Sequence, residues 1–274
     1  MLAIDVDGTL VDSRDELTPV VRDAVRRAAA AGVRIVLATG RRYSRALPLV
    51  EPLGIEAPIV SASGALIKDV LDHRTLFQAS FDRADLLRLL DVTARRGFDA
   101  VLYADTFDRG FDFYCPTLSV AEPTLAEYYA LNPDCGRALA DLMTAPPEGI
   151  FAGFAMGMRA DMLALHEALQ AALPEKLYTH VLRSPRYRGF MCEIAPAGAT
   201  KWSGIRRLAD LWNIADDEIC AVGDDVNDLP MIAGSGLGVA MGNAVDELKA
   251  AADRIAPTND ADGLAEVVRW VLGK

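Results

Sequence analysis

Short apolar runs recur at regular intervals over the first third of the chain. They cover residues 2–4, 33–38 and 58–62. Apart from Arg34 and Ser61, each run has the length and the apolar character of a strand that is buried on both faces of a parallel sheet. Between the first two runs, Thr18 and Pro19 can begin a helix over residues 20–31, which Gly32 ends. A second helix is predicted over residues 44–53. The resulting βαβαβ order predicts the start of a doubly wound α/β sheet.

The last third of the chain returns to this alternation. Strands are predicted at residues 219–222, 237–241 and 254–256, and helices at 201–212, 229–233, 245–252 and 263–272. The middle differs, because strands predicted at 98–103 and 111–114 are close enough to pair as a hairpin, which breaks the parallel order. We therefore expect a doubly wound parallel-sheet core from residues 1–81 and 185–274, with an α+β domain inserted at residues 82–184.

Composition narrows the class of protein. The 274 residues are 51% hydrophobic, enough to bury a substantial core. The net charge of −11 argues against nucleic acid as a partner, since an acidic protein and a phosphate backbone repel each other. No apolar run is long enough to span a bilayer, and the first residues lack the basic-then-apolar order of a signal peptide. We therefore expect a cytoplasmic protein without a membrane partner. Four well-separated cysteines and three histidines favour neither disulfides nor a zinc site, and the oligomeric state stays undetermined.

Polar side chains follow several of the predicted strands. Asp5 and Asp7 come directly after the first apolar run, Thr39 after the second, and Asp224 after the strand predicted at residues 219–222. The carboxyl ends of parallel strands meet at one edge of a sheet, where open α/β sheets bind ligands. Carboxylates gathered there suit a hard cation such as Mg²⁺, with Asp5 and Asp224 as candidate ligands. Such a cation lets an anionic nucleophile approach an anionic phosphate.

Each of these residues also has a simpler interpretation when it is taken alone. Aspartates in loops commonly form turns or cap helices, and we assign that role to Asp12, Asp15, Asp217 and Asp225. A lysine at the start of a helix, such as Lys201, is usually solvated. The functional hypothesis depends on the coincidence of several suitable residues at one predicted sheet edge.

The same residues resemble, in order, the four motifs of the haloacid-dehalogenase-like superfamily. Residues 5–10 resemble motif I, residues 39–41 motif II, Lys201 motif III and residues 223–228 motif IV. The insertion between motifs II and III is similar to the C2 cap class, and residues 258–263 resemble the closing segment of the Cof-type group, subfamily IIB. The resemblance implies a Rossmann-like core and a cap domain that closes over the site and governs specificity.

The resemblance also implies a role for each motif residue. Asp5 would attack the phosphoryl group and form an aspartyl-phosphate. Asp7 would protonate the leaving alcohol and later activate water, while its backbone carbonyl joins Asp5 and Asp224 as a ligand of Mg²⁺. The remaining implied roles are phosphate contact for Thr39, charge neutralisation for Lys201, and orientation of Lys201, phosphate or metal waters by Asn227 and Asp228. We also expect Gly40, Arg41 and Asn227 to bind substrate, Arg41 because it lies near the predicted chemistry.

These roles predict a Mg²⁺-dependent phosphatase for small phosphorylated metabolites, with sugar phosphates as the favoured class. Asp7 argues against a dehalogenase, because true dehalogenases of the superfamily lack an aspartate two residues past the nucleophile. A sugar phosphomutase is the alternative, since C2-type caps also occur in phosphomannomutases. Two hypotheses of another class are a phospho-aspartate switch, which receiver domains achieve in a much shorter chain, and a catalytically silent binding protein.

Two positions depart from the family pattern. Ser63 stands where many relatives have asparagine, so the contact which that amide makes is in doubt, and Trp202 replaces the glycine that usually follows the motif III lysine. We expect Trp202 to face the core. Substrate contacts in the inserted domain are harder to predict; the candidates are Arg183, Arg186, Tyr187 and Arg188, for which a solvated basic loop is an equally good interpretation.

Overall fold

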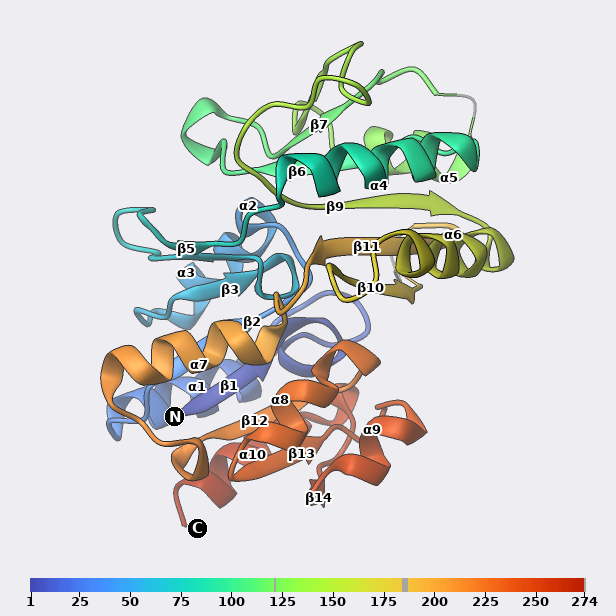
Figure 1. Cartoon of the computed structure of the whole chain (residues 1–274). Coiled ribbons are helices and arrows are strands. Elements are labelled where there is room, and N and C mark those ends of the chain that lie inside the picture. Colours follow the sequence, from blue (N-terminus) through green and yellow to red (C-terminus); the bar gives the residue numbers. More distant parts are fainter. Residues whose placement is uncertain (121, 184–186, 274) are drawn as a thin grey trace. The chain divides into compact units, whose positions relative to one another are not determined.

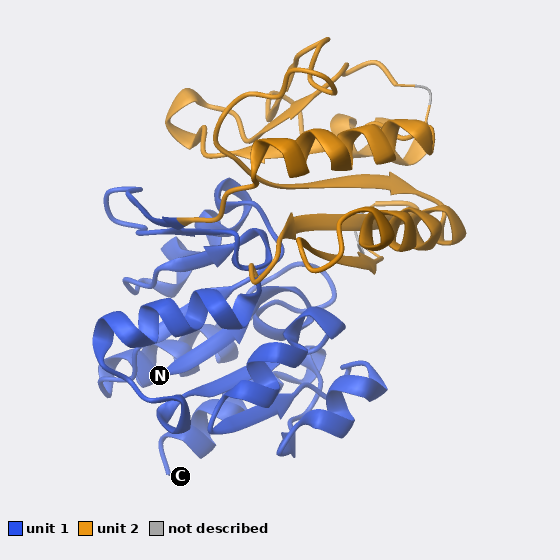
Figure 2. Cartoon of the chain, viewed as in Figure 1, with its two compact units in different colours: residues 1–77, 200–274 blue, residues 78–199 orange. Residues whose placement is uncertain are grey.

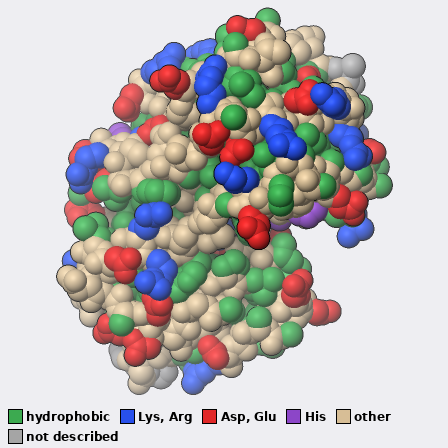
Figure 3. All heavy atoms as spheres, viewed as in Figure 1, with side chains coloured by type: hydrophobic (Ala, Val, Ile, Leu, Met, Phe, Trp, Pro, Cys, Tyr) green, Lys and Arg blue, Asp and Glu red, His purple; other side chains and the backbone are tan. Residues whose placement is uncertain are grey.

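The computed structural model describes residues 1–120, 122–183 and 187–273 (Figure 1). The chain divides into two compact units (Figure 2). Unit 1 combines Met1–Phe77 with Thr200–Lys274, and unit 2 is Gln78–Ala199. On the visible face of each unit in Figure 3, basic side chains lie among acidic ones. None of the described helices combines the length and the apolar character that a membrane span requires.

Unit 1 is built on one sheet with the strand order β14-β13-β12-β1-β2-β3-β4-β5. These strands are β1 Leu2–Asp5, β2 Ile35–Ala38, β3 Ile59–Ser61, β4 Leu66–Lys68, β5 Thr75–Gln78, β12 Cys220–Gly223, β13 Leu237–Ala240 and β14 Arg254–Ile255. All neighbouring pairs from β14 to β3 are parallel, and β4 is antiparallel to β3. The expected doubly wound parallel sheet is therefore present. The sequence prediction missed β4 and β5, which extend the sheet beyond β3.

Helices lie on both sides of this sheet (Figure 1). They are α1 Pro19–Ala30, α2 Tyr43–Ala46, α3 Val50–Leu53, α7 Lys201–Trp212, α8 Leu229–Gly234, α9 Asp246–Ala251 and α10 Gly263–Val271. Helix α1 packs against α10, and α7 packs against α8. The Thr18 side chain caps α1 by accepting a hydrogen bond from Val21 N at 3.2 Å, as its position before Pro19 predicts.

The helix predicted over residues 44–53 is interrupted. A 3₁₀ segment, Leu47–Leu49, separates α2 from α3. Pro48 lies inside that segment, and a proline has no backbone N–H to continue the α-helical hydrogen bonds. The break keeps both helices short.

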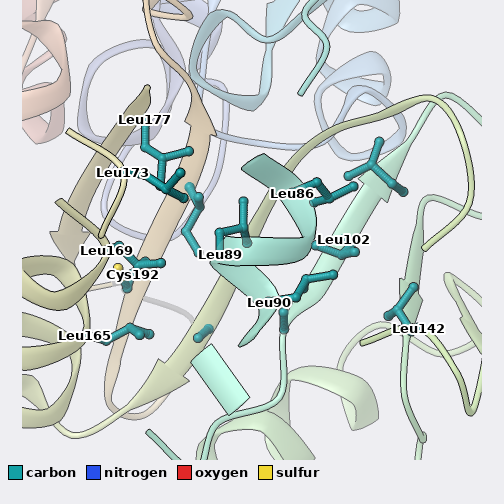
Figure 4. Packing of buried hydrophobic residues seen from close by; sticks show 14 of the residues in the cluster. Leu86, Leu89, Leu90, Leu102, Leu142, Leu165, Leu169, Leu173, Leu177 and Cys192 are labelled. Carbon is teal, nitrogen blue, oxygen red and sulfur yellow. The ribbon is translucent and has the colours of Figure 1, made fainter. Parts of the chain in front are cut away.

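Unit 2 is built on a separate sheet with the strand order β10-β11-β9-β6-β7-β8. The strands are β6 Val101–Ala104, β7 Phe113–Cys115, β8 Gly136–Ala138, β9 Ile150–Gly157, β10 Leu177–Leu182 and β11 Phe190–Pro196, and the helices are α4 Arg83–Arg95, α5 Pro123–Ala130 and α6 Arg159–Ala172. Leucines of α4 and α6 form one buried cluster with Cys192 of β11 (Figure 4). The antiparallel β6–β7 pair is the hairpin that the sequence predicts.

The limits of unit 2 differ from the predicted 82–184. Strand β11 pairs antiparallel with both β10 and β9, so it belongs to the sheet of unit 2. A boundary at 184/185 would cut this sheet between two paired strands. Unit 2 therefore runs from Gln78 to Ala199. The sequence of β11 alone does not indicate which sheet the strand joins, because the pairing of strands depends on tertiary contacts.

Candidate active site

Asp5 and Lys201 form a buried ion pair at the carboxyl end of β1. Asp5 is the last residue of β1, and Lys201 is the first residue of α7. The Lys201 Nζ donates to Asp5 Oδ1 at 2.6 Å, and the two residues are 2% and 3% exposed. Thr200 fixes the start of α7, since its Oγ1 accepts from Ser203 N and Ser203 Oγ accepts from Thr200 N, both at 3.1 Å. This capping box positions Lys201 opposite Asp5.

The same lysine contacts motif IV. Its Nζ donates to Asp228 Oδ1 at 2.6 Å and to Asn227 Oδ1 at 3.2 Å. Burial alone lowers the pKa of Lys201, but the charges of Asp228 and Asp5 outweigh burial and raise it. The lysine is therefore a fixed positive charge, and its three N–H groups have acceptors on two strand ends.

Asp228 connects this lysine to the motif IV backbone. Its Oδ2 accepts hydrogen bonds from Asp224 N at 2.9 Å and from Asp225 N at 3.1 Å. A Cβ at Gly223 would lie 2.4 Å from Asp228 Cγ, so only glycine leaves room for this carboxylate. The turn after β12 is thus built around Asp228, which orients Lys201 on one side and Asp224 on the other.

Three carboxylates gather where a cation could bind. Among the described residues, ligand atoms of Asp5, Asp224 and Asp228 lie within 4.8 Å of one another. Burial and the charge of Asp228 raise the pKa of Asp5 well above its ordinary value and that of Asp224 to about 7. An oxygen-only donor set with excess negative charge fits Mg²⁺. Lys201 contacts Oδ1 of Asp5, and Oδ2 of Asp5 accepts no hydrogen bond from the described residues.

The Asp7 carboxylate is not one of these three, and it pairs with Arg41. The Arg41 Nε donates to Asp7 Oδ2 at 3.0 Å, and Nη2 donates to Oδ1 at 2.7 Å. Nη2 also contacts Asp15. The Arg41 side chain is 10% exposed and that of Asp7 is 43% exposed, so the acid is open to solvent while its partner is largely covered. Asp15, interpreted from sequence as a turn residue, reaches this pair from a left-handed conformation with φ 65°.

Thr39 and Gly40 complete the edge at the end of β2. Thr39 is fully buried, its N donates to Val60 O at 2.8 Å, and its Oγ1 accepts from Arg41 N at 3.0 Å. Gly40 is half-buried between Thr39 and Arg41. Thr39 and Arg41 therefore lie at the same strand end and are joined by a hydrogen bond.

The two departures from the family pattern have local explanations. Trp202 packs against the core cluster of unit 1 and fills the space over Gly234, where a Cβ would lie 2.4 Å from the indole, so it faces the core as expected. Ser63 is buried with φ 54°, a left-handed conformation that asparagine adopts more readily than serine. Its N donates to Thr39 O at 3.0 Å, which joins the residue to motif II through its backbone.

Several other sequence interpretations can be compared with the structure. Asp12 forms a turn, because its Oδ1 accepts from Arg14 N and Glu16 N. Asp225 caps the turn after it by accepting from Val226 N at 2.7 Å. Both agree with the simpler interpretation.

The basic segment of unit 2 is only partly described. Tyr187 packs on Tyr128 with ring centroids 5.0 Å apart and accepts from Asn132 Nδ2 at 3.0 Å. Arg183 is exposed, and Arg188 N donates to Glu127 Oε2 at 3.1 Å. Arg186 lies outside the described residues.

One residue of the site was missed from sequence. Asn243 follows β13 in the loop Gly242–Ala244 and donates to Asp224 Oδ2 at 3.3 Å. A lone asparagine beside a glycine usually indicates a turn, so nothing in the local pattern distinguishes it. Its partner is 19 residues away in the sequence.

The chain is similar to known proteins over nearly its whole length. The sequence model of the haloacid dehalogenase-like hydrolase family matches residues 2–268. The chain is 29% identical over 292 residues to "Phosphatase YwpJ" of Bacillus subtilis (strain 168), with 99% of each chain covered. It is 27% identical over 298 residues to "5-amino-6-(5-phospho-D-ribitylamino)uracil phosphatase YwtE" of the same organism, covering 99% of this chain and 97% of the relative. A crystal structure of a haloacid dehalogenase-like hydrolase from Bacteroides thetaiotaomicron superposes with a TM-score of 0.81 at 27% identity, covering 98% of both chains.

Proposed function

Since the chain belongs to the haloacid dehalogenase-like hydrolase family, we propose that it is a Mg²⁺-dependent phosphatase that hydrolyses small phosphorylated metabolites through an aspartyl-phosphate. The observation that carries the proposal is the position of Lys201 between Asp5 and Asp228, with Asp224 beside them. A buried carboxylate in contact with a fixed cation on one oxygen, whose other oxygen accepts no hydrogen bond from the described residues, has the features of a nucleophile directed at an anionic substrate. Relatives named as phosphatases support the reaction class.

The first step is attack by Asp5. Its Oδ2, which does not contact Lys201, forms the new O–P bond while the P–O bond to the leaving alcohol breaks. Asp7 gives its proton to the departing oxygen, so the alcohol leaves neutral. Thr39 contacts the phosphoryl oxygens, and the nearby positive charge of Lys201 balances part of their charge.

The second step removes the phosphoryl group from Asp5. Asp7, now a carboxylate, takes a proton from water, and the oxygen of that water attacks phosphorus. The bond to Asp5 breaks, so inorganic phosphate and the original carboxylate are restored. Arg41, already bonded to both oxygens of Asp7, keeps this carboxylate in one orientation for the step.

The metal would be held by the carboxylates of Asp5 and Asp224 and the backbone carbonyl of Asp7. Bound there, Mg²⁺ supplies positive charge that offsets repulsion between nucleophile and phosphate. Asp228 then orients Lys201 and the motif IV backbone rather than serving as a ligand, because both of its oxygens already accept hydrogen bonds.

The substrate class is that of small phosphomonoesters, with sugar phosphates first. Net charge of −11 disfavours a polyanionic partner, and a relative is named for a substrate with a phosphorylated ribityl chain. A panel of phosphorylated sugars, sugar alcohols and nucleotides, assayed for released phosphate, tests the class. Isomerised sugar phosphate formed faster than free phosphate would instead indicate a phosphomutase.

The direct test uses 4-nitrophenyl phosphate with Mg²⁺ or with EDTA. We expect activity with Mg²⁺ only, and Asp5→Asn, which keeps shape but loses the nucleophilic charge, is expected to lower kcat by at least about a thousandfold. Asp12→Asn is the matched control, because among the described residues the hydrogen bonds of this carboxylate go only to Arg14 and Glu16 in its own turn. Activity that survives in Asp5→Asn would exclude Asp5 as the nucleophile.

A further inference from the structure

The side-chain amide of Asn243 joins three segments that are far apart in the sequence. Its Nδ2 donates to Gly8 O at 2.9 Å and to Asp224 Oδ2 at 3.3 Å. Its Oδ1 accepts from Asn259 N at 2.9 Å. Both hydrogens of the amide nitrogen and one lone pair of the oxygen are thus used. One side chain therefore links the motif I loop, the motif IV aspartate and the loop before α10.

The first two of these segments are in close contact. Gly8 has φ 73°, and a Cβ there would lie 2.1 Å from Asp224 Oδ2. Asn243 bonds the backbone carbonyl on one side of this contact and the carboxylate on the other. Because a carboxylate can rotate about its terminal bond, a donor on Oδ2 limits that rotation and sets where Oδ1 points.

The third segment anchors Asn243 itself. Asn259 is 8% exposed, and its Nδ2 donates to Val11 O at 3.0 Å. Two further bonds hold the same loop to the chain after motif I: Ser13 N donates to Asp260 Oδ1 at 2.9 Å, and Thr18 Oγ1 donates to Asp262 Oδ1 at 2.5 Å. The loop 258–262 is therefore a fixed support for the Asn243 carbonyl, although Asn243 is exposed.

We propose that Asn243 is a positioning residue for the divalent cation, which acts by holding the Asp224 carboxylate and the Gly8 peptide in register with each other. The proposal rests on the proposed function only in taking Asp224 as a metal ligand. Hydrogen-bond partners of metal-ligating carboxylates typically contribute about 10- to 100-fold to metal affinity. Asn243 never touches the reacting atoms, so its effect is on binding of the cation.

The test is Mg²⁺ binding measured by titration calorimetry on the full chain. Asn243→Ala removes all three bonds, and Asn243→Leu removes them while keeping nearly the same size. We expect both to raise the Kd for Mg²⁺ about tenfold or more. They should also reduce the rise in Tm that Mg²⁺ produces.

Asp260→Ala is the matched control. It removes the bond to Ser13 from the same loop without touching Asn243 or Asp224. We expect it to lower Tm and leave the Kd for Mg²⁺ unchanged. A Kd within twofold of the wild type in both Asn243 variants, or an equal rise in Asp260→Ala, would overturn the proposal.

Failure of the proposed function can be recognised separately. Suppose that the wild type shows no phosphatase activity and that Mg²⁺ binds more weakly to the Asn243 variants than to the wild type. This result would reject the phosphatase and support the positioning role. A wild-type protein that hydrolyses phosphomonoesters without binding Mg²⁺ would reject the positioning role.

Discussion

Arg41 donates to both carboxylate oxygens of Asp7, with 3.0 Å from Nε to Oδ2 and 2.7 Å from Nη2 to Oδ1. The sequence suggests Arg41 as a substrate contact, but in the structure its guanidinium orients the proposed acid and base. Two hydrogen bonds from one guanidinium to one carboxylate fix the orientation of both groups more rigidly than a lysine contact does. Within the proposed mechanism, Arg41 therefore acts through Asp7.

The first prediction concerns this pair. We expect Arg41→Ala to lower kcat/KM for an alkyl phosphate such as glucose 6-phosphate about 10- to 100-fold, because Asp7 loses its orientation. The loss should be smaller for 4-nitrophenyl phosphate, whose leaving group needs no proton. Arg41→Lys should behave like the alanine variant. Equal losses for both substrates would show that Arg41 acts only in binding.

The second prediction concerns the stability of the buried cluster. Lys201→Met leaves Asp5 and Asp228 without their cation, and we expect it to lower the free energy of unfolding at pH 8 in EDTA by about 3–5 kcal/mol. Lys176→Met is the control, since that lysine is 62% exposed and pairs with Asp85 at 3.5 Å. Lys176→Met should lower the free energy of unfolding by less than about 1 kcal/mol. Denaturant unfolding curves measure the free energy of unfolding of both variants. Similar losses in the two would contradict the assignment of Lys201 as the cation that stabilises the buried cluster.

The third prediction is a pH dependence of stability without metal. Burial and the charge of Asp228 raise the pKa of Asp224 to about 7, above the value of about 3.9 for an unfolded aspartate. The folded protein therefore holds the Asp224 proton more tightly than the unfolded chain does. The stability that this protonation contributes is fully present below about pH 4 and is lost as the pH rises through about 7.

In EDTA, we expect Tm to fall from pH 5 to pH 8 more steeply for the wild type than for Asp224→Asn, which cannot ionise there. Mg²⁺ should reverse the fall, because the cation binds the ionised carboxylates. Parallel Tm curves for the two proteins in EDTA would show that Asp224 carries no such shift.

The fourth prediction concerns Gly64, which has φ 104° and lies against the start of α7. A Cβ there would be 2.0 Å from Thr200 O. Gly64→Ala should cost about 3 kcal/mol or more of stability and displace Lys201. Gly32→Ala is the control, because Gly32 has φ 88° but no atom within 4 Å of the added Cβ. It should cost about 1 kcal/mol and leave activity unchanged.

Local patterns in the sequence determined the strands of unit 1 other than β4 and β5, and the strand ends of the site. The start of α1 follows from Thr18 and Pro19, which act on adjacent backbone groups. Asp5, Thr39 and Asp224 could be predicted at one edge because parallel strands place their carboxyl ends together. The role of Lys201 in the site followed only from the family resemblance.

Tertiary structure decided the features that depend on distant partners. Arg41 and Asp7 are 34 residues apart, and Asn243 and Gly8 are 235 apart, so no local signal indicates either contact. The same holds for β11, whose place in unit 2 depends on pairing with β9 and β10. Periodicity reports which face of an element is buried; which side chains meet there is set by long-range packing.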